Sequence, residues 1–276
     1  MTDQPRISFN DGNSIPQIGL GVWQTPNAGA ADAVRAALEA GYRHIDTAAA
    51  YNNEGGVGEG IRASGLGRDE VFVTTKIWNE DQGYDRTLKA LDASLKRLKM
   101  DRVDLILIHW PSPQRDLFVD TWRALIKARE AGQARSIGVS NFEPEHLDRI
   151  VEETGVTPVL NQVELHPGFE QKRLRAAHSA RDIRTESWSP LGQGKVLNDP
   201  VIAGIAAKYG KTPAQVIIRW HLDNGLIVIP KSVTPSRIRE NFDVFGFKLD
   251  SGDMERIAGL EDVGGRIGPN PMTATF

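Results

Sequence analysis

Eight short segments rich in aliphatic and β-branched residues recur along this chain, and helical patterns fill the gaps between them. Most of the eight are dense in Ile, Val and Leu, as expected for parallel strands that are buried on both faces. Eight strands that alternate with helices over about 250 residues is the count of a (β/α)8 barrel. The predicted strands are Gln17–Trp23, Tyr42–Thr47, Val71–Lys76, Val103–Trp110, Ser136–Asn141, Val159–Leu165, Ile183–Pro190 and Leu226–Ser232.

The helical segments are recognised by apolar residues spaced three and four apart and by their end signals. Thr212-Pro213-Ala214-Gln215 has the pattern of a capping box with proline at the first helical position. Thr234-Pro235 opens another helix in the same way. The other helical stripes expected on this basis are Val34–Gly41, Leu88–Leu98 and Leu147–Gly155, and the glycines end two of them.

The segment before the first predicted strand has the pattern of a hairpin. Ile7–Asn10 and Ser14–Ile18 are joined by Asp11-Gly12, which favours a tight turn. The alternative fold is an open doubly wound sheet, but its G-x-G-x-x-G fingerprint is missing, because Gly19-Leu20-Gly21 continues to Gln24. We find no linker, repeat or change of composition, so residues 1–276 are expected to form a single α/β barrel domain with an N-terminal β-hairpin.

Composition excludes several classes of function. The chain has no cysteine, which excludes disulfides, thiolate metal sites, Fe–S ligation and cysteine nucleophiles. Its 33 basic and 36 acidic side chains give a net charge of −3, which does not favour nucleic-acid binding. The first ten residues lack an apolar signal core, and the apolar stretches are too short to span a bilayer. A cytoplasmic protein without membrane partners is therefore expected, and the absence of an evident apolar surface element favours a monomer.

Polar side chains gather at the carboxyl ends of the predicted strands, where barrel enzymes carry their catalytic groups. Tyr51 follows the second of these ends by five residues. One alternative is that His44, Asp46, His109 and His166 hold a metal ion and make the protein a hydrolase. In order along the chain, the strand ends carry Asp46, Lys76, His109, Ser140, Asn141, Gln162, Trp188 and Lys231.

Four of these residues suggest acid catalysis. An ordinary tyrosine has a pKa near 10, and a nearby ammonium favours the phenolate and lowers that pKa. Lys76 could supply the ammonium and Asp46 its counter-charge, so Tyr51 is predicted to be a tuned general acid. A neutral His109 could orient the same oxygen. Protonation of an oxygen as charge develops on it fits hydride addition to a carbonyl, which requires a nicotinamide cofactor because no side chain delivers hydride.

Five segments resemble the aldo-keto reductases, in the right order and over nearly the whole chain. The resemblance implies a barrel, NADPH dependence, and Asp46, Tyr51, Lys76 and His109 as the catalytic tetrad. Within that family, Glu186–Gly194 most resembles the bacterial 2,5-diketo-D-gluconate reductases. The five segments are Gly41–Ala48, Val73–Trp78, Ile108–Pro111, Gly138–Phe142 and Ile229–Val233.

The resemblance also implies where the cofactor binds. Ser140, Asn141 and Gln162 match the positions that hold the nicotinamide carboxamide, and Trp188 matches the residue that stacks on the ring. Other positions that match cofactor contacts are Gly21, Val22, Trp23, Asp46, His109, Ser189, Pro190, Leu191, Gly192, Gln193, Gly194, Lys231, Ser232, Val233, Arg237, Glu240 and Asn241. Lys231, Ser232 and Arg237 match the pocket for the 2′-phosphate of the adenosine, which predicts a preference for NADPH over NADH. The helix opened by Thr234-Pro235 would offer unpaired N–H groups to that anion.

The same resemblance assigns the substrate pocket to Trp23, Tyr51, Trp78, His109 and Trp110. Aromatic faces suit carbonyl compounds whose remaining structure varies. The Gly- and Pro-rich tail Gly264–Phe276 matches the loop that closes the pocket. Sugar-derived ketones and keto acids, such as 2,5-diketo-D-gluconate, and small dicarbonyls are the expected substrates. The metal-dependent hydrolase is one alternative, and an NADPH-binding partner subunit without turnover is another; the complete tetrad argues against the second.

Overall fold

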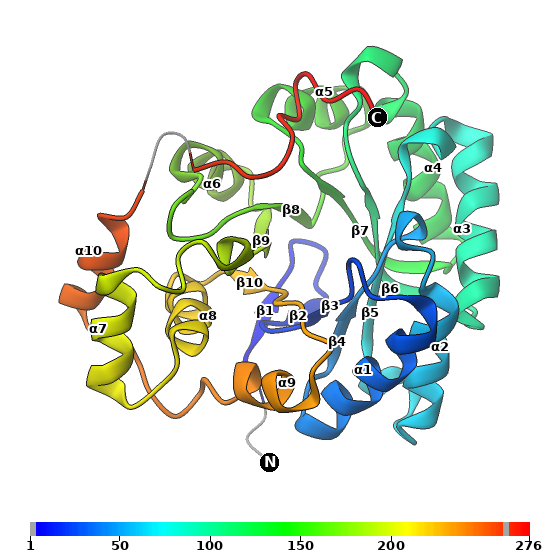
Figure 1. Cartoon of the computed structure of the whole chain (residues 1–276). Coiled ribbons are helices and arrows are strands. Elements are labelled where there is room, and N and C mark those ends of the chain that lie inside the picture. The colour runs from blue at the N-terminus through cyan, green and yellow to red at the C-terminus, as the bar shows by residue number, and fades with distance from the viewer. Residues whose placement is uncertain (1–3, 262–264) are drawn as a thin grey trace.

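The computed structural model describes residues 4–261 and 265–276, and at its centre is an eight-stranded parallel sheet whose strand order follows the sequence. Parallel bridges from Ile18 to Val228 and from Gly21 to Lys231 join the first strand to the last, so the sheet closes. Helices surround it (Figure 1), and the predicted (β/α)8 barrel is confirmed. The strands are β3 (Leu20–Gly21), β4 (His44–Asp46), β5 (Phe72–Ile77), β6 (Val103–Ile108), β7 (Ala134–Ser140), β8 (Leu160–Glu164), β9 (Arg184–Trp188) and β10 (Ile227–Val228).

All eight predicted strands are present, but the two at the seam are much shorter than expected. In β3 and β10 only two residues each form a continuous ladder, and the flanking residues pair through single bridges. The start of the first predicted strand is constrained by a close approach. A Cβ at Gly19 would lie 2.4 Å from Nδ1 of His44, so only glycine lets the first strand pass this interior side chain.

The predicted helix signals are confirmed. Gly41 ends α1 at a φ of 112°, and Thr212 and Gln215 form the reciprocal capping box of α8. No helix in the described part of the chain is long and apolar enough to cross a membrane. The helices are α1 (Asn27–Ala40), α2 (Glu54–Ala63), α3 (Tyr84–Leu98), α4 (Phe118–Glu130), α5 (Pro144–Thr154), α6 (Lys172–Ala180), α7 (Pro200–Tyr209), α8 (Pro213–Asp223), α9 (Pro235–Phe242) and α10 (Ser251–Ala258), with short 3₁₀ turns that include η1 (Ala49–Tyr51) and η5 (Gly192–Gly194).

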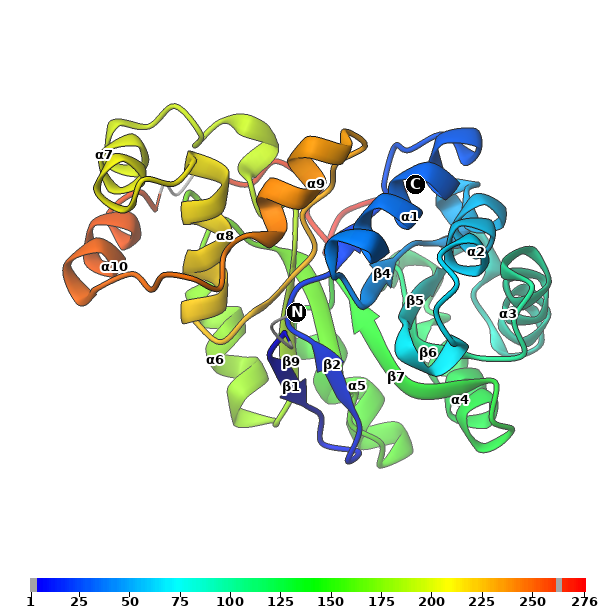
Figure 2. The ribbon, with the colours of Figure 1, turned by 90° about the horizontal axis from the view of Figure 1, so that it is seen from below.

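The predicted hairpin, β1 (Arg6–Ser8) and β2 (Ser14–Pro16), covers the amino end of the barrel (Figure 2). Its turn is held to the start of β7, because Asn13 donates to Ser136 Oγ at 3.2 Å and Ser136 donates to Asp11 at 2.7 Å. The hairpin thus lies at the opposite end of the barrel from the tail that follows residue 264, whose contacts are with the carboxyl ends of the strands.

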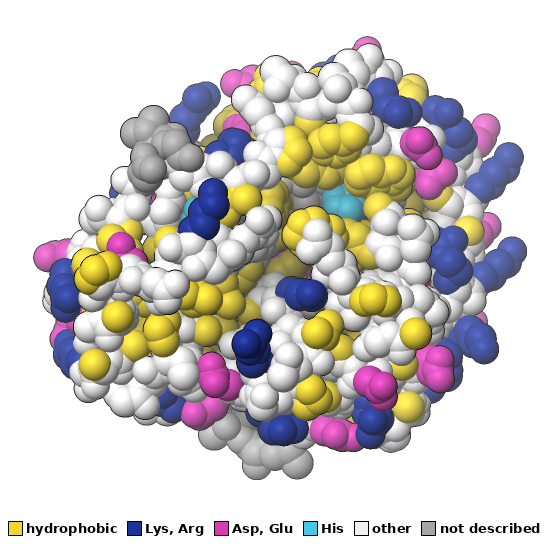
Figure 3. Space-filling view, in the orientation of Figure 1, with side chains coloured by type: hydrophobic (Ala, Val, Ile, Leu, Met, Phe, Trp, Pro, Cys, Tyr) yellow, Lys and Arg dark blue, Asp and Glu magenta, His cyan; other side chains and the backbone are white. Residues whose placement is uncertain are grey.

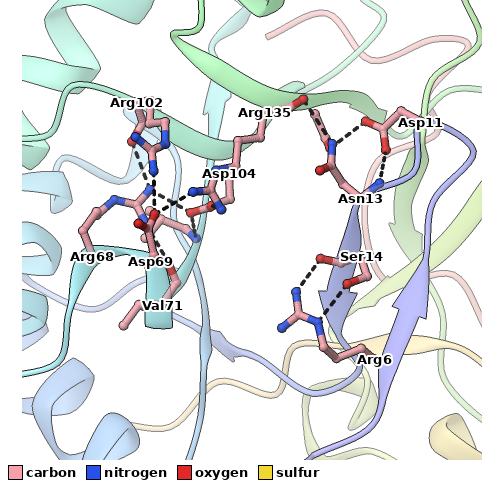
Figure 4. Close-up of polar contacts among 12 residues, drawn as sticks. Arg6, Asp11, Asn13, Ser14, Arg68, Asp69, Val71, Arg102, Asp104 and Arg135 are labelled. Carbon is pink, nitrogen blue, oxygen red and sulfur yellow. Dashed lines mark hydrogen bonds and ion pairs between the residues drawn. The ribbon is translucent and has the colours of Figure 1, made fainter.

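An ionic network surrounds the same amino end (Figure 4). Arg68 lies 2.7 Å from the buried carboxylate of Asp104, and Asp69 bridges Arg102 and Arg135. Asp104 also accepts from the backbone N–H of Val73 at 2.9 Å, which ties the network to β5. Exposed ion pairs of this kind each contribute at most about 1 kcal/mol to stability. The buried and hydrogen-bonded Asp104 therefore contributes more to stability than the exposed pairs of Asp69.

The barrel interior has two halves of different character. The amino half is apolar and includes hairpin side chains that pack against inward-facing strand residues. The carboxyl half is polar, because every second residue of β4, β5, β8 and β9 carries a charged or hydrogen-bonding group into it. The apolar half comprises Phe9, Ile15, Phe72, Leu105, Leu107, Val159, Leu160 and Ile227. The polar half comprises His44, Asp46, Thr74, Lys76, Gln162 and Glu186.

The apolar half of the interior, here called the apolar plug, includes hairpin side chains, which predicts that the hairpin stabilises the barrel. Ile15 is fully buried in the plug, so Ile15→Ala should lower the free energy of unfolding by about 2–5 kcal/mol. The measurement is urea unfolding followed by tryptophan fluorescence. Ile7→Ala is the matched control, because Ile7 pairs with Ile15 across the hairpin but is only partly buried. Equal losses in the two variants would show that the hairpin does not act as a plug.

Candidate active site

The carboxyl end of the barrel is hollowed, and hydrophobic side chains line the hollow with a histidine exposed at its floor (Figure 3). Asp46 ends β4, Lys76 is the fifth residue of β5, and His109 follows β6 directly. Tyr51 ends the short turn η1, which follows β4. The structure therefore brings these four residues together from three neighbouring strands and one loop.

A buried ion pair is the centre of this group. Lys76 Nζ donates to Asp46 Oδ1 at 2.5 Å and to the backbone oxygen of Thr47 at 2.9 Å. The second oxygen of Asp46 accepts from Gln162 Nε2 at 2.8 Å. Burial lowers the pKa of Lys76, but the neighbouring acidic groups, Asp46 first, raise the pKa by more, so the lysine carries its charge. A charged ammonium is thus fixed inside the barrel.

Tyr51 and His109 lie beside this pair. Lys76 Nζ is 5.2 Å from the centre of the Tyr51 ring, and the centres of the Tyr51 and His109 rings are 5.7 Å apart. Burial holds the pKa of His109 well below its usual value, and the charge of Lys76 adds to this, so the imidazole is neutral. The neutral state matches the role suggested by the sequence, in which His109 donates a hydrogen bond to a carbonyl oxygen.

The expected net lowering of the Tyr51 pKa is wrong for this structure. Burial raises the pKa of the phenol, and the attraction of Lys76, although it acts in the predicted direction, does not outweigh that effect. Two carboxyl groups, Asp46 and Glu186, also raise it. Tyr51 is therefore a protonated phenol at neutral pH, with its proton available for donation, and Lys76 is the group that favours giving it up.

Aromatic rings form the wall of the hollow. Trp78 lies 5.1 Å from His109 between ring centres, and Trp110 is buried behind it. Phe276, which the sequence did not single out, stacks on Trp78 at 5.8 Å with an interplanar angle of 8° and meets Trp110 edge-on at 5.1 Å. Its backbone oxygen accepts from Asn79 Nδ2 at 3.1 Å. The described part of the predicted tail, which excludes Gly264, therefore ends against the proposed substrate pocket.

Glu164 is a second residue that sequence reasoning missed. It lies two residues after Gln162 on β8 and accepts from the backbone N–H groups of Ile267 and Gly268, the latter at 2.8 Å. Burial raises the pKa of Glu164, but the hydrogen bonds from His166 and from the tail lower it by more. A Cβ at Gly268 would lie 2.5 Å from Cη2 of Trp188, so the tail passes directly against that indole. The available signal was its spacing, because a residue two positions after Gln162 on the same strand faces the same side.

The residues matched to the nicotinamide form a connected polar chain. Ser140 donates to the backbone oxygen of Gln162 at 2.8 Å, and Asn141 donates to the backbone oxygen of His109 at 3.0 Å. Trp188 donates from its indole N–H to Asn141 Oδ1 at 2.9 Å. This chain joins the ends of β7, β8 and β9 to the tetrad.

The region matched to the adenosine is built around the start of α9. Lys231 and Arg237 are exposed, and neither forms an ion pair with a carboxylate of the described residues. Ser232 Oγ accepts from the N–H of Thr234. Glu240 instead accepts from Thr212 Oγ1 at 3.0 Å, so its side chain is directed toward α8. The loop Leu191–Gly194, which by the same resemblance should lie along the pyrophosphate of the cofactor, contains η5 and comes shortly after β9.

The residues of the metal alternative do not form a cluster. His44 lies 3.2 Å from Thr74 Oγ1, and His166 contacts Glu164 at 3.2 Å. Within residues 4–261 and 265–276, no group of three or more His, Asp or Glu side chains is placed to hold a metal ion. The arrangement instead offers a proton donor, a neutral imidazole and a fixed cation at the floor of an apolar hollow.

This fold and this arrangement of side chains are those expected of a barrel enzyme, and comparison with known proteins identifies its family. The sequence profile of the Aldo/keto reductase family matches residues 17–262. The chain is 60% identical to an aldo-keto reductase of Mycolicibacterium smegmatis and 53% identical to the methylglyoxal reductase DkgA of Escherichia coli, with 98–99% of each chain covered. A mutant of Gox0644, solved in complex with NADPH, superposes with a TM-score of 0.96 at 54% identity and 99% coverage of both chains. The chain belongs to the aldo/keto reductase family.

The hydrogen bonds from Ile267 and Gly268 to Glu164 predict that this carboxylate holds the tail in place. A glutamine there keeps one acceptor oxygen instead of two and removes the charge, so Glu164→Gln should loosen the tail. Because a hydrogen bond to a charged group contributes roughly 1.5–3 kcal/mol, trypsin should cut after Arg266 at least about tenfold faster. Mass spectrometry of the released peptide measures this rate.

Glu261→Gln is the control for that experiment. Glu261 is an exposed carboxylate near the same tail, and it pairs with Lys172 rather than with the tail backbone. Its replacement should leave the cleavage rate unchanged. If both variants are cut at the wild-type rate, Glu164 does not hold the tail.

Proposed function

We propose that this protein reduces an aldehyde or ketone to the alcohol, with NADPH as cofactor and Tyr51 as the general acid. The observation that carries the proposal is the buried Lys76–Asp46 pair beside a protonated Tyr51 and a neutral His109, at the floor of an aromatic hollow. NADPH, when bound, supplies the hydride that adds to the carbonyl carbon. Family membership and the NADPH complex of a similar protein support this reading.

The residues of the chain act on the carbonyl oxygen. Tyr51 gives its proton to that oxygen as negative charge develops, and the fixed charge of Lys76 favours the phenolate that is left behind. Asp46 keeps Lys76 charged and in place. The neutral His109 donates a hydrogen bond to the same oxygen and orients it. The ring walls from Trp78 and Trp110 exclude water, which strengthens each of these electrostatic effects.

The chemistry of the matched residues suits NADPH. Both amide hydrogens of Gln162 are already given to carboxyl groups, and no donor among the described residues approaches its Oε1, which suits an acceptor for the N–H of a carboxamide. At the other end, two exposed cations and the start of α9 suit a phosphate. We assign Ser140, Asn141, Gln162 and Trp188 to the nicotinamide, and Lys231, Ser232 and Arg237 to the 2′-phosphate.

Small dicarbonyl compounds are the substrate class that we favour over the bulkier sugar-derived keto acids. Phe276 lies against Trp78 and Trp110, which narrows the hollow above His109. The 53% identity to a methylglyoxal reductase over nearly the whole chain agrees with a small substrate. 2,5-Diketo-D-gluconate remains in the proposed range as the larger member of the same class of reactive ketones.

Tyr51→Phe tests the acid directly. The variant keeps the ring but loses the proton, so turnover of methylglyoxal with NADPH should fall by about 10²–10⁴. Binding of NADPH, measured by quenching of tryptophan fluorescence, should be unchanged. Tyr84→Phe, at an exposed position on α3, is the matched control and should retain full activity. A fully active Tyr51→Phe enzyme would exclude Tyr51 as the acid.

Replacement of Lys231 or Arg237 with alanine tests the phosphate pocket. Each variant loses one charge-assisted contact, so the ratio of the dissociation constants for NADH and NADPH should shrink by about tenfold, with NADH affinity nearly constant. Arg239→Ala is the matched control, because Arg239 is an exposed cation on the same helix, two residues further on. An unchanged ratio in both pocket variants would remove these residues from the cofactor site.

A further inference from the structure

Beneath the tetrad lies a second carboxyl group for which the proposed reaction has no use. Glu186 belongs to β9 and is paired in register with Gln162 of β8. Its side chain is fully buried, and its Oε2 accepts from Gln162 Nε2 at 2.7 Å. The same nitrogen donates to Asp46 Oδ2 at 2.8 Å. One amide thus gives both of its hydrogens to two carboxyl groups, one from the tetrad and one from below it.

The charges around Glu186 do not balance a second carboxylate. Among the described residues, Lys76 is the cation that acts on Glu186, and it already bonds to Asp46. His44, whose Nε2 is 3.8 Å from Glu186 Oε1, is neutral because burial, with the charge of Lys76, lowers its pKa to about 3. Glu186 Oε1 is buried without a hydrogen-bond partner among the described residues. An ionised Glu186 would therefore be an uncompensated buried charge, which is strongly unfavourable.

The titratable groups that face Glu186 come from three directions. β4 contributes His44 and Asp46, β5 contributes Lys76, and Tyr51 lies above them. The neighbouring strands β8 and β10 pair it with Gln162 and Ile227, which do not titrate. Burial raises the pKa of Glu186 to about 8, and the negative charge of Asp46 adds to this. At neutral pH the group is a carboxylic acid.

We propose that Glu186 is a positioning residue that must stay protonated. As a neutral acid it accepts from Gln162 without adding charge, and together with Asp46 it fixes the amide so that Gln162 offers the cofactor only its carbonyl oxygen. Loss of the proton places a negative charge below the tetrad, makes Tyr51 a weaker acid and slows carbonyl reduction. This inference rests on the proposed function, because it assumes that Tyr51 donates the proton.

Glu186→Gln separates the charge from the shape, since glutamine retains an acceptor oxygen but cannot ionise. In the wild-type enzyme, kcat/KM for methylglyoxal should fall at least about fivefold between about pH 7 and about pH 9.5, with an inflection near the pKa of about 8. That inflection should be absent in Glu186→Gln. Glu59→Gln, on the exposed face of α2, is the control and should keep it. An equal alkaline fall in Glu186→Gln would overturn the proposal.

Glu186→Leu removes the acceptor as well and frees one hydrogen of the Gln162 amide. NADPH should then bind at least about fivefold more weakly, because the amide is no longer held in one orientation. Unchanged NADPH affinity in Glu186→Leu would contradict the positioning role. Circular dichroism of both variants distinguishes a folded protein from a misfolded one, and Glu186→Gln keeps the test available where leucine is not tolerated.

Two further measurements do not depend on turnover. Infrared difference spectra between about pH 6 and about pH 9.5 should contain the carbonyl stretch of a carboxylic acid that ionises, and Glu186→Gln should lack it. Stability gives the same information: because the folded pKa of Glu186 is raised above its ordinary value of 4.5, its contribution to stability falls as the pH rises from about 4.5 to about 8. Glu186→Gln should show a smaller loss of melting temperature over that range than the wild type.

The infrared result separates the failure of this inference from the failure of the proposed function. If the Glu186 signal is present but Tyr51→Phe is fully active, the reaction scheme falls together with the effect of Glu186 on Tyr51. The protonation of Glu186 and its hydrogen bond with Gln162 would stand. Absence of the signal, with Tyr51→Phe inactive, would overturn the role of Glu186 and leave the reaction scheme intact.

Discussion

The buried ion pair between Lys76 and Asp46 is the interaction on which the carboxyl half of the barrel depends. Transfer of each charge from water costs several kcal/mol, and the attraction of the two ions offsets that cost only if their other hydrogen-bonding positions are also filled. Thr47 supplies its backbone oxygen to the ammonium, and Gln162 supplies an N–H to the carboxylate. Removal of either ion would leave an uncompensated buried charge, which typically destabilises by about 3–5 kcal/mol.

This requirement explains why the barrel interior is divided. A polar network inside a protein must be complete, whereas an apolar region needs only close packing. The strands meet both conditions by changing character along their inward face: on β5, Phe72 belongs to the apolar half, while Thr74 and Lys76, further along the same face, belong to the polar half. The hairpin fills the amino end with Phe9 and Ile15, so the chemistry at the other end rests on a packed base rather than on solvent.

The sequence was sufficient for the fold because the signals for it are local. Eight buried strands, their intervening helices and the capping box around Thr212 could all be recognised from residues close together in the chain. The sequence also predicted that Asp46 and Lys76 lie close together, since the carboxyl ends of neighbouring parallel strands are at the same edge of the sheet. The Tyr51 pKa was mistaken because burial, which no local pattern measures, outweighs the attraction of Lys76. Glu186 was considered only as part of a sequence motif. Its position on β9, in register with Gln162 of β8, nevertheless directs its side chain toward that residue.

The C-terminal tail illustrates a different limit, because its contacts join residues that are far apart in the sequence. Phe276 meets Trp78 almost 200 positions away, and Gly268 lies against Trp188 while Glu164 holds its N–H. No element of the barrel depends on these contacts, since the tail is added to strands that are already paired on both sides. A chain of this fold can therefore change the width of its substrate hollow by changing the tail while Lys76, Asp46 and their partners stay fixed. The paired strands hold the charges that the proposed reaction requires of any carbonyl substrate. The tail, which contacts one carboxylate and three indoles, shapes the space around a particular substrate.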